Sequence, residues 1–184
     1  MTGRPWLGLA AGAVAFAAGL AAVWPLASAV LAAPASSRPA WPATAQPLVV
    51  QEVLSGDSVV FTSTRTGPQV SDLGTITVRL IGIDAPNFPT SRECYAEESQ
   101  AALAAMLPEG SIAWVVTDEV LQDEGGRWLG YVWSGEGDFV NDVLVANGIV
   151  RPYEMAPNEA FWPILAQSAE EAFRRSAGLW SACS

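Results

Sequence analysis

Residues 75–86 read TITVRLIGIDAP, which is the pattern of a strand with one buried face. Apolar side chains recur at every second position, and successive side chains of a strand point to opposite faces. Arg79 falls on the other face, and an arginine inside a hydrophobic strand needs an anionic partner. Pro86 stops the strand just beyond Asp84. The stretch therefore predicts a strand over 75–83 that presents a carboxylate at its end.

The elements around this strand point to a small barrel. Turn-bounded apolar runs predict four more strands, at 48–54, 58–64, 112–117 and 128–133. Helices are predicted at 97–107, 138–147 and 157–176. The early strands have no crossover helices between them, which argues against parallel βαβ units. We therefore predict an α+β fold dominated by a small β-barrel: a five-stranded OB-fold with an inserted helix and C-terminal helices.

The N-terminal third of the chain differs from the rest. Residues 5–33 carry no charge and are nearly all apolar, and Arg4 precedes them, as in an export signal. The run is also long enough to span a bilayer, so a cleaved signal peptide and an uncleaved anchor both remain open. The positive residue on the N-terminal side predicts an extracytoplasmic domain, secreted or anchored to the cytoplasmic membrane. The expected organisation is a signal peptide or anchor over 1–33, a Pro-rich linker over 34–47 and a folded domain over 48–184.

The composition of the 184-residue chain excludes several kinds of site. The chain has no histidine, two cysteines and a formal net charge of −10. Catalytic triads and zinc sites that need histidine are excluded, and two cysteines are too few for a four-thiolate zinc site. Any metal would be held by oxygen atoms, which favours Ca²⁺, Mg²⁺ or Mn²⁺. The negative charge opposes a nucleic-acid partner unless a divalent cation and local arginines offset it.

The two cysteines fit an exported domain. Cys94 lies near the middle of the predicted domain, and Cys183 lies at its end. In an oxidising compartment we expect them to form one disulfide; the alternative is two unrelated free thiols.

Two predicted turns carry the acidic candidates for a site. Asp57 follows one tight turn and Asp84 ends a strand, so neighbouring strands would bring both carboxylates to one rim of the barrel. With the backbone carbonyl of Ala85, they would suit Ca²⁺; the alternative is two turn aspartates that bond their own backbone. Arg79 and Arg127 could clamp a phosphate. Taken singly, Arg79 is better explained by a salt bridge, and Arg127 by an exposed turn.

Six segments between residues 48 and 182 resemble the thermonuclease family, also called staphylococcal-nuclease-like. They occur in the family's order and with similar spacing. The segments are SGDS at 55–58, VRLIGIDAP at 78–86, ECYAEE at 93–98, GRWLGYVW at 126–133, VNDVLV at 140–145 and GLW at 178–180.

The resemblance implies an OB-fold with appended helices that hydrolyses DNA and RNA with Ca²⁺ as cofactor. It also implies roles for six residues. These are Asp57, Asp84 and the carbonyl of Ala85 as calcium ligands, Arg79 and Arg127 as clamps on the phosphate, and Tyr153 as a nucleotide contact.

The sequence departs from the family pattern at the position of the general base. The family's glutamate after the Asp-x-Pro unit is Asn87 here, and an amide cannot accept a proton at neutral pH. Loss of a general base typically costs about 10²–10⁴ in rate. Three carboxylates nearby in the sequence are candidates to replace it: Glu93, Glu97 and Glu98.

We therefore predict an exported Ca²⁺-dependent nuclease, with an activity that Asn87 is expected to weaken. The expected substrate is DNA or RNA, preferably single-stranded, and the expected state is a monomer. Contact with a membrane is expected only through an uncleaved N-terminal segment. The alternative is a catalytically inactive OB-fold module that binds nucleic acid, a nucleotide or a protein.

Overall fold

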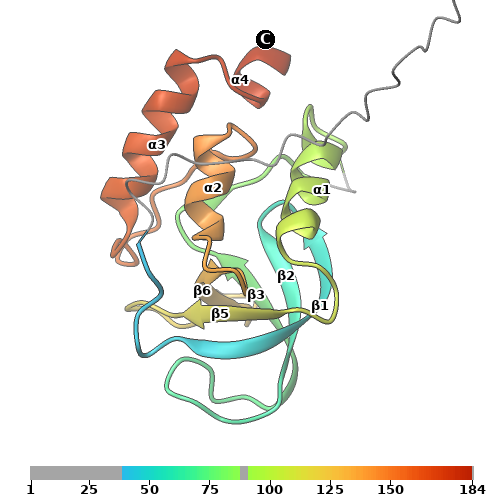
Figure 1. Ribbon diagram of the computed structural model, residues 1–184, viewed down its shortest axis with the longest axis vertical. Coiled ribbons are helices and arrows are strands. Elements are labelled where there is room, and N and C mark those ends of the chain that lie inside the picture. The colour runs from blue at the N-terminus through green and yellow to red at the C-terminus, as the bar shows by residue number, and fades with distance from the viewer. Residues whose placement is uncertain (1–38, 88–90, 184) are drawn as a thin grey trace, which may run out of the picture. The chain divides into compact units, whose positions relative to one another are not determined.

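The computed structural model describes residues 39–87 and 91–183, and these residues build a closed five-stranded barrel (Figure 1). Around the barrel the strands follow the order β1-β2-β3-β6-β5. Neighbouring strands are antiparallel, except that β3 and β6 are parallel. The predicted five-stranded barrel is thereby confirmed. Its strands are β1 (Gln46–Ser55), β2 (Ser58–Ser63), β3 (Gly74–Leu80), β5 (Ile112–Val116) and β6 (Trp128–Trp133).

Strand β1 closes the barrel because it pairs with two neighbours. Its first residues, from Gln46 to Val49, pair with β5, and the residues from Val49 onward pair with β2. The register with β2 shifts between Val50 and Glu52 and again before Ser55. Such irregularities bend a strand and increase its twist, which lets β1 curve from one partner to the other.

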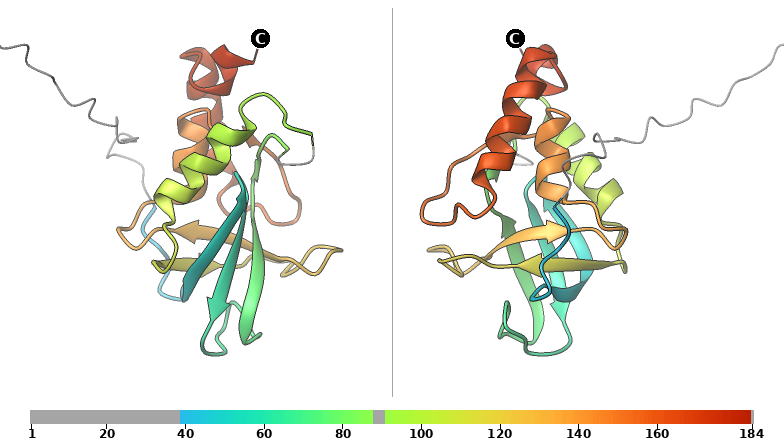
Figure 2. Two further views of the ribbon diagram at one scale, coloured as in Figure 1. Left: turned by 90° about the vertical axis from the view of Figure 1, so that its right-hand side faces the viewer. Right: turned by 60° about the vertical axis from the view of Figure 1, so that its left-hand side comes forward.

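Within the described residues, the helices gather over one end of the barrel (Figure 1, Figure 2). Helix α1 packs against β1, while α2 packs against both β6 and α3. Beside the barrel, β4 and β7 form a separate two-stranded sheet in which Asp84 lies opposite Arg151. These elements are α1 (Ala96–Met106), α2 (Val140–Ala146), α3 (Trp162–Arg174), α4 (Leu179–Ala182), β4 (Ile83–Asp84) and β7 (Arg151–Pro152).

The core continues from the barrel interior to the helices. Large apolar side chains from every barrel strand are buried, among them Leu48, Phe61, Leu80, Val115 and Leu129. An aromatic cluster extends this core, with ring centroids 4.6 to 6.1 Å apart, and consists of Tyr131, Trp133, Phe139 and Phe161. Aromatic pairs at such distances add about 0.5–1.5 kcal/mol each beyond their burial. The barrel and the residues just before α2 and α3 are therefore one packed unit.

The structure places the start of the folded domain earlier than residue 48. Trp41 stacks on Trp114, with ring centroids 5.0 Å apart, and the backbone carbonyl of Pro39 accepts a hydrogen bond from Trp133 Nε1 at 2.8 Å. Gln46 is buried and already paired in β1. Residues 39–47, which we expected to be part of a linker, thus pack on the barrel. The predicted leader and residues 34–38 lie outside the described residues.

The last long helix begins later than predicted, at Trp162 rather than at Pro157. The amide side chain of Asn158 bonds both the N–H and the carbonyl of Val120, at 2.7 and 2.9 Å. Its own N–H donates to the carbonyl of Met155. Asn158 therefore fastens this segment to the connection between β5 and β6, and the helix starts only beyond it.

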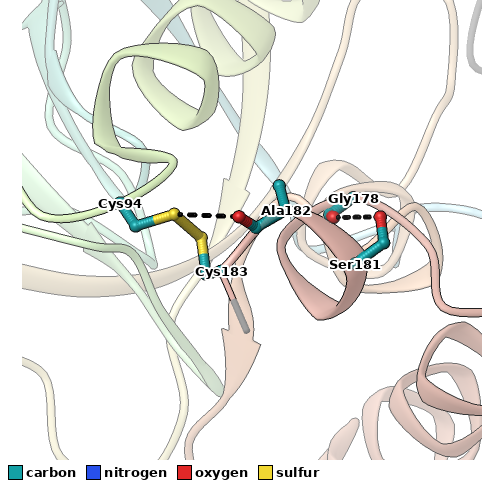
Figure 3. The surroundings of a disulfide bond; sticks show 5 residues. All are labelled: Cys94, Gly178, Ser181, Ala182 and Cys183. Carbon is teal, nitrogen blue, oxygen red and sulfur yellow. Dashed lines mark hydrogen bonds between the residues drawn. A yellow bond between two sulfur atoms is a disulfide. The ribbon is translucent and has the colours of Figure 1, made fainter.

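A disulfide joins Cys94, just before α1, to Cys183, just after α4 (Figure 3). The predicted pairing is confirmed. The sulfur of Cys94 also lies 3.6 Å from the carbonyl oxygen of Ala182, at the end of α4. In the chain-entropy account, closing so long a loop stabilises a fold by about 4–5 kcal/mol. Among residues 39–87 and 91–183 there is no helix with the length and apolar character needed to cross a bilayer.

Candidate functional site

Asp57 occupies the turn between β1 and β2 and is 8% exposed. Its Oδ1 accepts hydrogen bonds from the hydroxyl groups of Ser55 and Ser58, at 2.9 Å each. Its Oδ2 accepts a hydrogen bond from the backbone N–H of Ala85 at 2.8 Å. This last bond ties the first turn to the residue after Asp84, so the two acidic turns meet at one rim of the barrel.

Arg79, near the end of β3, lies between the two acids. Its Nη2 donates to Asp84 Oδ1 at 3.0 Å and lies 3.3 Å from Asp57 Oδ2. Its Nη1 donates to the backbone carbonyls of Leu80 and Ile83, at 3.0 and 2.8 Å. Because the side chain is only 10% exposed, these four contacts replace most of its water. Arg79 was expected to bind either a phosphate or a carboxylate of the protein, and the structure shows the salt bridge to the protein's own carboxylates.

Asp84 is the more accessible of the two acids, with a side chain that is 58% exposed. Its pKa is raised, chiefly because partial burial penalises the charged form. Arg79 opposes that rise, whereas the charges of Asp57 and Glu93 add to it. A cation at this position would favour the ionised form of Asp84.

Arg127 precedes β6 and is held by Asp123. Its Nε donates to Asp123 Oδ2 at 2.7 Å, and its backbone N–H donates to Asp123 Oδ1 at 2.9 Å. Burial acts to raise the pKa of Asp123, but hydrogen bonds from Arg127 and from the N–H of Gly125 outweigh it, so that this pKa is lowered. The Arg127 side chain is still 46% exposed. Within the described part of the chain, its Nη1 and Nη2 donate no hydrogen bond to protein.

These side chains line one open, polar cavity of about 360 Å³. Both predicted metal-binding acids, both predicted arginines, the carbonyl-bearing Ala85 and Asn87 contribute to its wall. The lining residues are Ser55, Asp57, Ser58, Arg79, Asp84, Ala85, Pro86, Asn87 and Arg127. Tyr153 is not among them, although its backbone N–H donates to the carbonyl of Gly82 at 2.9 Å and its side chain is exposed.

Asn87 is paired with a carboxylate. Its Nδ2 donates to Glu93 Oε1 at 2.9 Å, and its backbone N–H donates to Glu93 Oε2 at 3.1 Å. The Glu93 N–H in turn donates to the carbonyl of Asn87 at 3.2 Å. The hydrogen bond from the Asn87 side chain is the main cause of the lowered pKa of Glu93. Of the three acids considered near the base position, Glu93 is the one in contact with Asn87.

One charged residue near the site, Arg151, was not predicted from the sequence. Arg151 pairs with Asp84 across the β4–β7 sheet, and its charge acts on both Asp84 and Glu93. Its guanidinium carbon also lies 5.8 Å from the ring centroid of Trp180. Strands of two residues have no periodicity, so no sequence pattern indicates that Arg151 faces the acidic turn.

The donor set suits a hard cation that keeps part of its water. The described residues contain no group of three or more His, Cys, Asp or Glu placed to hold a metal. Among the residues that line the cavity, Asp57 and Asp84 carry carboxylates and Ala85 a backbone carbonyl, all of which are oxygen donors. Calcium takes six to eight oxygen ligands and accepts waters among them. Asp57 and Asp84 already share one cationic partner in Nη2 of Arg79, which shows that positive charge is accommodated between them.

Comparisons with known proteins agree with this architecture. An uncharacterized endonuclease of Escherichia coli O157:H7 is 28% identical over 132 residues, covering 72% of this chain and 75% of that protein. The thermonuclease of Staphylococcus intermedius is 25% identical over 135 residues, covering 72% of this chain and 74% of that protein. The family model described as staphylococcal nuclease homologue matches residues 77–182, which include Arg79, Asp84 and Arg127. The chain therefore belongs to the staphylococcal nuclease family.

Proposed function

We propose that the chain is an exported Ca²⁺-dependent nuclease that hydrolyses phosphodiester bonds of DNA or RNA. The observation that carries the proposal is the single cavity lined by two carboxylates and two arginines. Metal-assisted phosphodiester hydrolysis needs a hard cation and fixed positive charge around the phosphate. Both kinds of group meet here, on the scaffold of a nuclease family.

In this proposal, Asp57, Asp84 and the carbonyl of Ala85 hold Ca²⁺. Bound there, the ion would supply the positive charge against which a phosphate is placed. Hydroxyl and amide donors already fix the orientation of the Asp57 carboxylate at the cavity wall.

The two arginines would act differently. Arg127 keeps both terminal nitrogens for phosphate oxygens, while Asp123 fixes its Nε. Arg79 is buried among fixed partners, so it would contribute positive charge at the cavity wall without large movement. Preorganised donors of this kind stabilise charge that develops in a transition state.

Substrate and compartment are part of the same proposal. The cavity is open at the surface, which suits a single strand that can bend its phosphate into it, and Tyr153 would contact a nucleotide beside it. The formal charge of −10 makes the local arginines and the cation essential for attraction. The apolar N-terminal run and the disulfide support an extracytoplasmic location. A monomeric state is part of the same proposal.

The first experiment compares cleavage of single-stranded DNA with Ca²⁺ and with a chelator. Cleavage is expected only with Ca²⁺. The Arg127→Ala variant should lower kcat by about 10²–10³, the usual cost of one transition-state donor. Arg65→Ala is the matched control: it removes an exposed positive charge beyond the far end of β2, and its activity should match that of the unmodified chain. Absence of cleavage at every Ca²⁺ concentration would refute the proposal.

The alternative is an inactive barrel that binds nucleic acid, a nucleotide or a protein. Asn87 at the cavity wall is the observation that favours it. Binding of an oligonucleotide without cleavage, together with cleavage by an Asn87→Glu variant, would support this alternative.

A further inference from the structure

A carboxylate outside the acidic pair is held by a residue of the cavity wall. Both oxygens of Glu93 accept hydrogen bonds from Asn87, one from the side chain and one from the backbone. Asn87 itself lines the cavity. An ordinary surface glutamate samples many rotamers, whereas this carboxylate is fixed through two oxygens to a residue of the site.

The Glu93 carboxylate keeps room for a water molecule. A carboxylate has about four acceptor positions, and the described residues fill three of them: two from Asn87 and a long one, 3.5 Å, from the Ser91 hydroxyl. Glu93 is exposed, so water reaches it freely. Its hydrogen-bond partner Asn87 lines the cavity together with Asp84.

Three other acids, Asp57, Asp84 and Glu97, already have partners of their own. Asp57 is nearly buried and accepts hydrogen bonds on both oxygens. Asp84 is paired with Arg79. Glu97 lies 3.8 Å from a guanidinium nitrogen of Arg92 and lines a separate hollow between β1 and α1.

From this arrangement we infer that Glu93 is the general base of the hydrolysis, with Asn87 as the residue that positions it. The inference rests on the proposed nuclease function. An oxygen of Glu93 accepts one proton from water while the water oxygen forms the new bond to phosphorus. The bond from phosphorus to the leaving alkoxide breaks, the alkoxide takes a proton from solvent, and Glu93 returns its proton to solvent.

The hydrogen bonds that hold Glu93 also weaken it as a base, because they lower its pKa. The carboxylate is therefore ionised at neutral pH and always ready to accept a proton, but with a small driving force. Arg151 on β7 also lowers the pKa of Glu93, and the charge of Glu93 in turn raises the pKa of Asp84 on β4. The fixed position of the Glu93 carboxylate, more than its basicity, would therefore account for its contribution to the rate.

The test is the Glu93→Gln variant of the full chain, assayed on single-stranded DNA with Ca²⁺. The amide keeps the size of the side chain and can still accept from Asn87. We expect kcat to fall about 10²–10⁴-fold. KM should stay the same or fall, because the variant removes a negative charge that repels the substrate. If Glu93 acted only through its negative charge, the variant would instead cleave DNA faster, because the repulsion of the substrate would be removed.

Two variants and one binding measurement isolate the effect. Glu98→Gln removes the same charge in the first turn of α1, and its kcat should match that of the unmodified chain. Asn87→Glu combined with Glu93→Gln places a carboxylate in the cavity wall and should recover activity. The Kd of a nucleoside 3′,5′-bisphosphate, which has no internucleotide bond to cleave, should be unchanged or tighter in Glu93→Gln.

The outcomes separate the two proposals. If the unmodified chain cleaves DNA and Glu93→Gln cleaves it equally well, Glu93 is not the base, and the nuclease proposal stands. A loss of activity that Glu98→Gln shares to the same extent also overturns the role of Glu93. If the unmodified chain does not cleave DNA, both proposals fail.

Discussion

Replacing Arg79 by methionine should destabilise the protein in a way that calcium reverses. Methionine retains an unbranched apolar stem but removes the guanidinium that contacts both acids and two backbone carbonyls. Asp84, 58% exposed, regains water when this partner is lost, so its cost is small. Asp57, whose side chain is 11% exposed, is left as a buried charge without a cation.

The size of the loss follows from these contacts. Removing one partner of a buried ion pair typically costs about 3–5 kcal/mol. Asp57 keeps three neutral donors, from two serines and the N–H of Ala85, so we expect a loss near 3 kcal/mol, at the lower end of that range. Without the arginine, the two acids should attract Ca²⁺ more strongly. At a hundred times its Kd, an ion that binds only the folded state restores about 2.7 kcal/mol.

Urea unfolding at neutral pH, with chelator and with Ca²⁺, measures both effects. The matched control is Arg174→Met, because Arg174 pairs with Glu170 at 3.7 Å and both side chains are more than 60% exposed. Such surface pairs contribute at most about 1 kcal/mol. Adding Asp57→Asn to Arg79→Met should recover part of the loss, since the uncompensated charge is then removed. A loss no larger than that of the control, or an equal Ca²⁺ response in both arginine variants, would refute the reasoning.

Two further predictions concern Asp123 and the disulfide. The folded-state pKa of Asp123 is lowered, so its contribution to stability is present above its unfolded-state value and is lost as pH falls through the lowered value. In Asp123→Asn, the loss of stability between neutral pH and about pH 3 should therefore be smaller than in the unmodified chain. Equal acid sensitivity in both proteins would contradict this expectation. The kcat of the variant should also fall, because Arg127 Nε loses its partner. Replacing Cys94 and Cys183 together by serine should lower the free energy of unfolding by about 4–5 kcal/mol in urea unfolding, and an unchanged midpoint would contradict the entropic account.

The sequence predicted the barrel because its strands carry strong local signals. Alternation along 75–83 and turn residues such as Gly56 mark where strands run and end, and the observed strands begin and end close to those positions. The meeting of Asp57 and Asp84 could be expected for the same reason, because Asp57 lies in a turn between two strands and Asp84 ends a strand. The hydrogen bonds of Asp123 could also be predicted, because an aspartate shortly before a Gly-Gly pair commonly forms a turn in which its side chain bonds the backbone of the next residues.

Other features depend on contacts that no local pattern encodes. The β4–β7 pairing that brings Arg151 opposite Asp84 involves strands of two residues. The late start of α3 depends on Asn158, which bonds to Val120 in a different part of the chain. The pairing of Asn87 with Glu93 depends on how one irregular loop closes, so the sequence left three glutamates as equal candidates.

Because β1 pairs with both β2 and β5, the barrel can close only late in the synthesis of the chain. Gln46 pairs with Val115, and Val78 pairs with Trp128, so the ring of strands stays open until β6 has been synthesised. The antiparallel β1–β2–β3 meander can form first, because its pairings are local. A nascent chain that stalls before β6 would therefore expose two unpaired strand edges, a template for aggregation that the finished barrel removes.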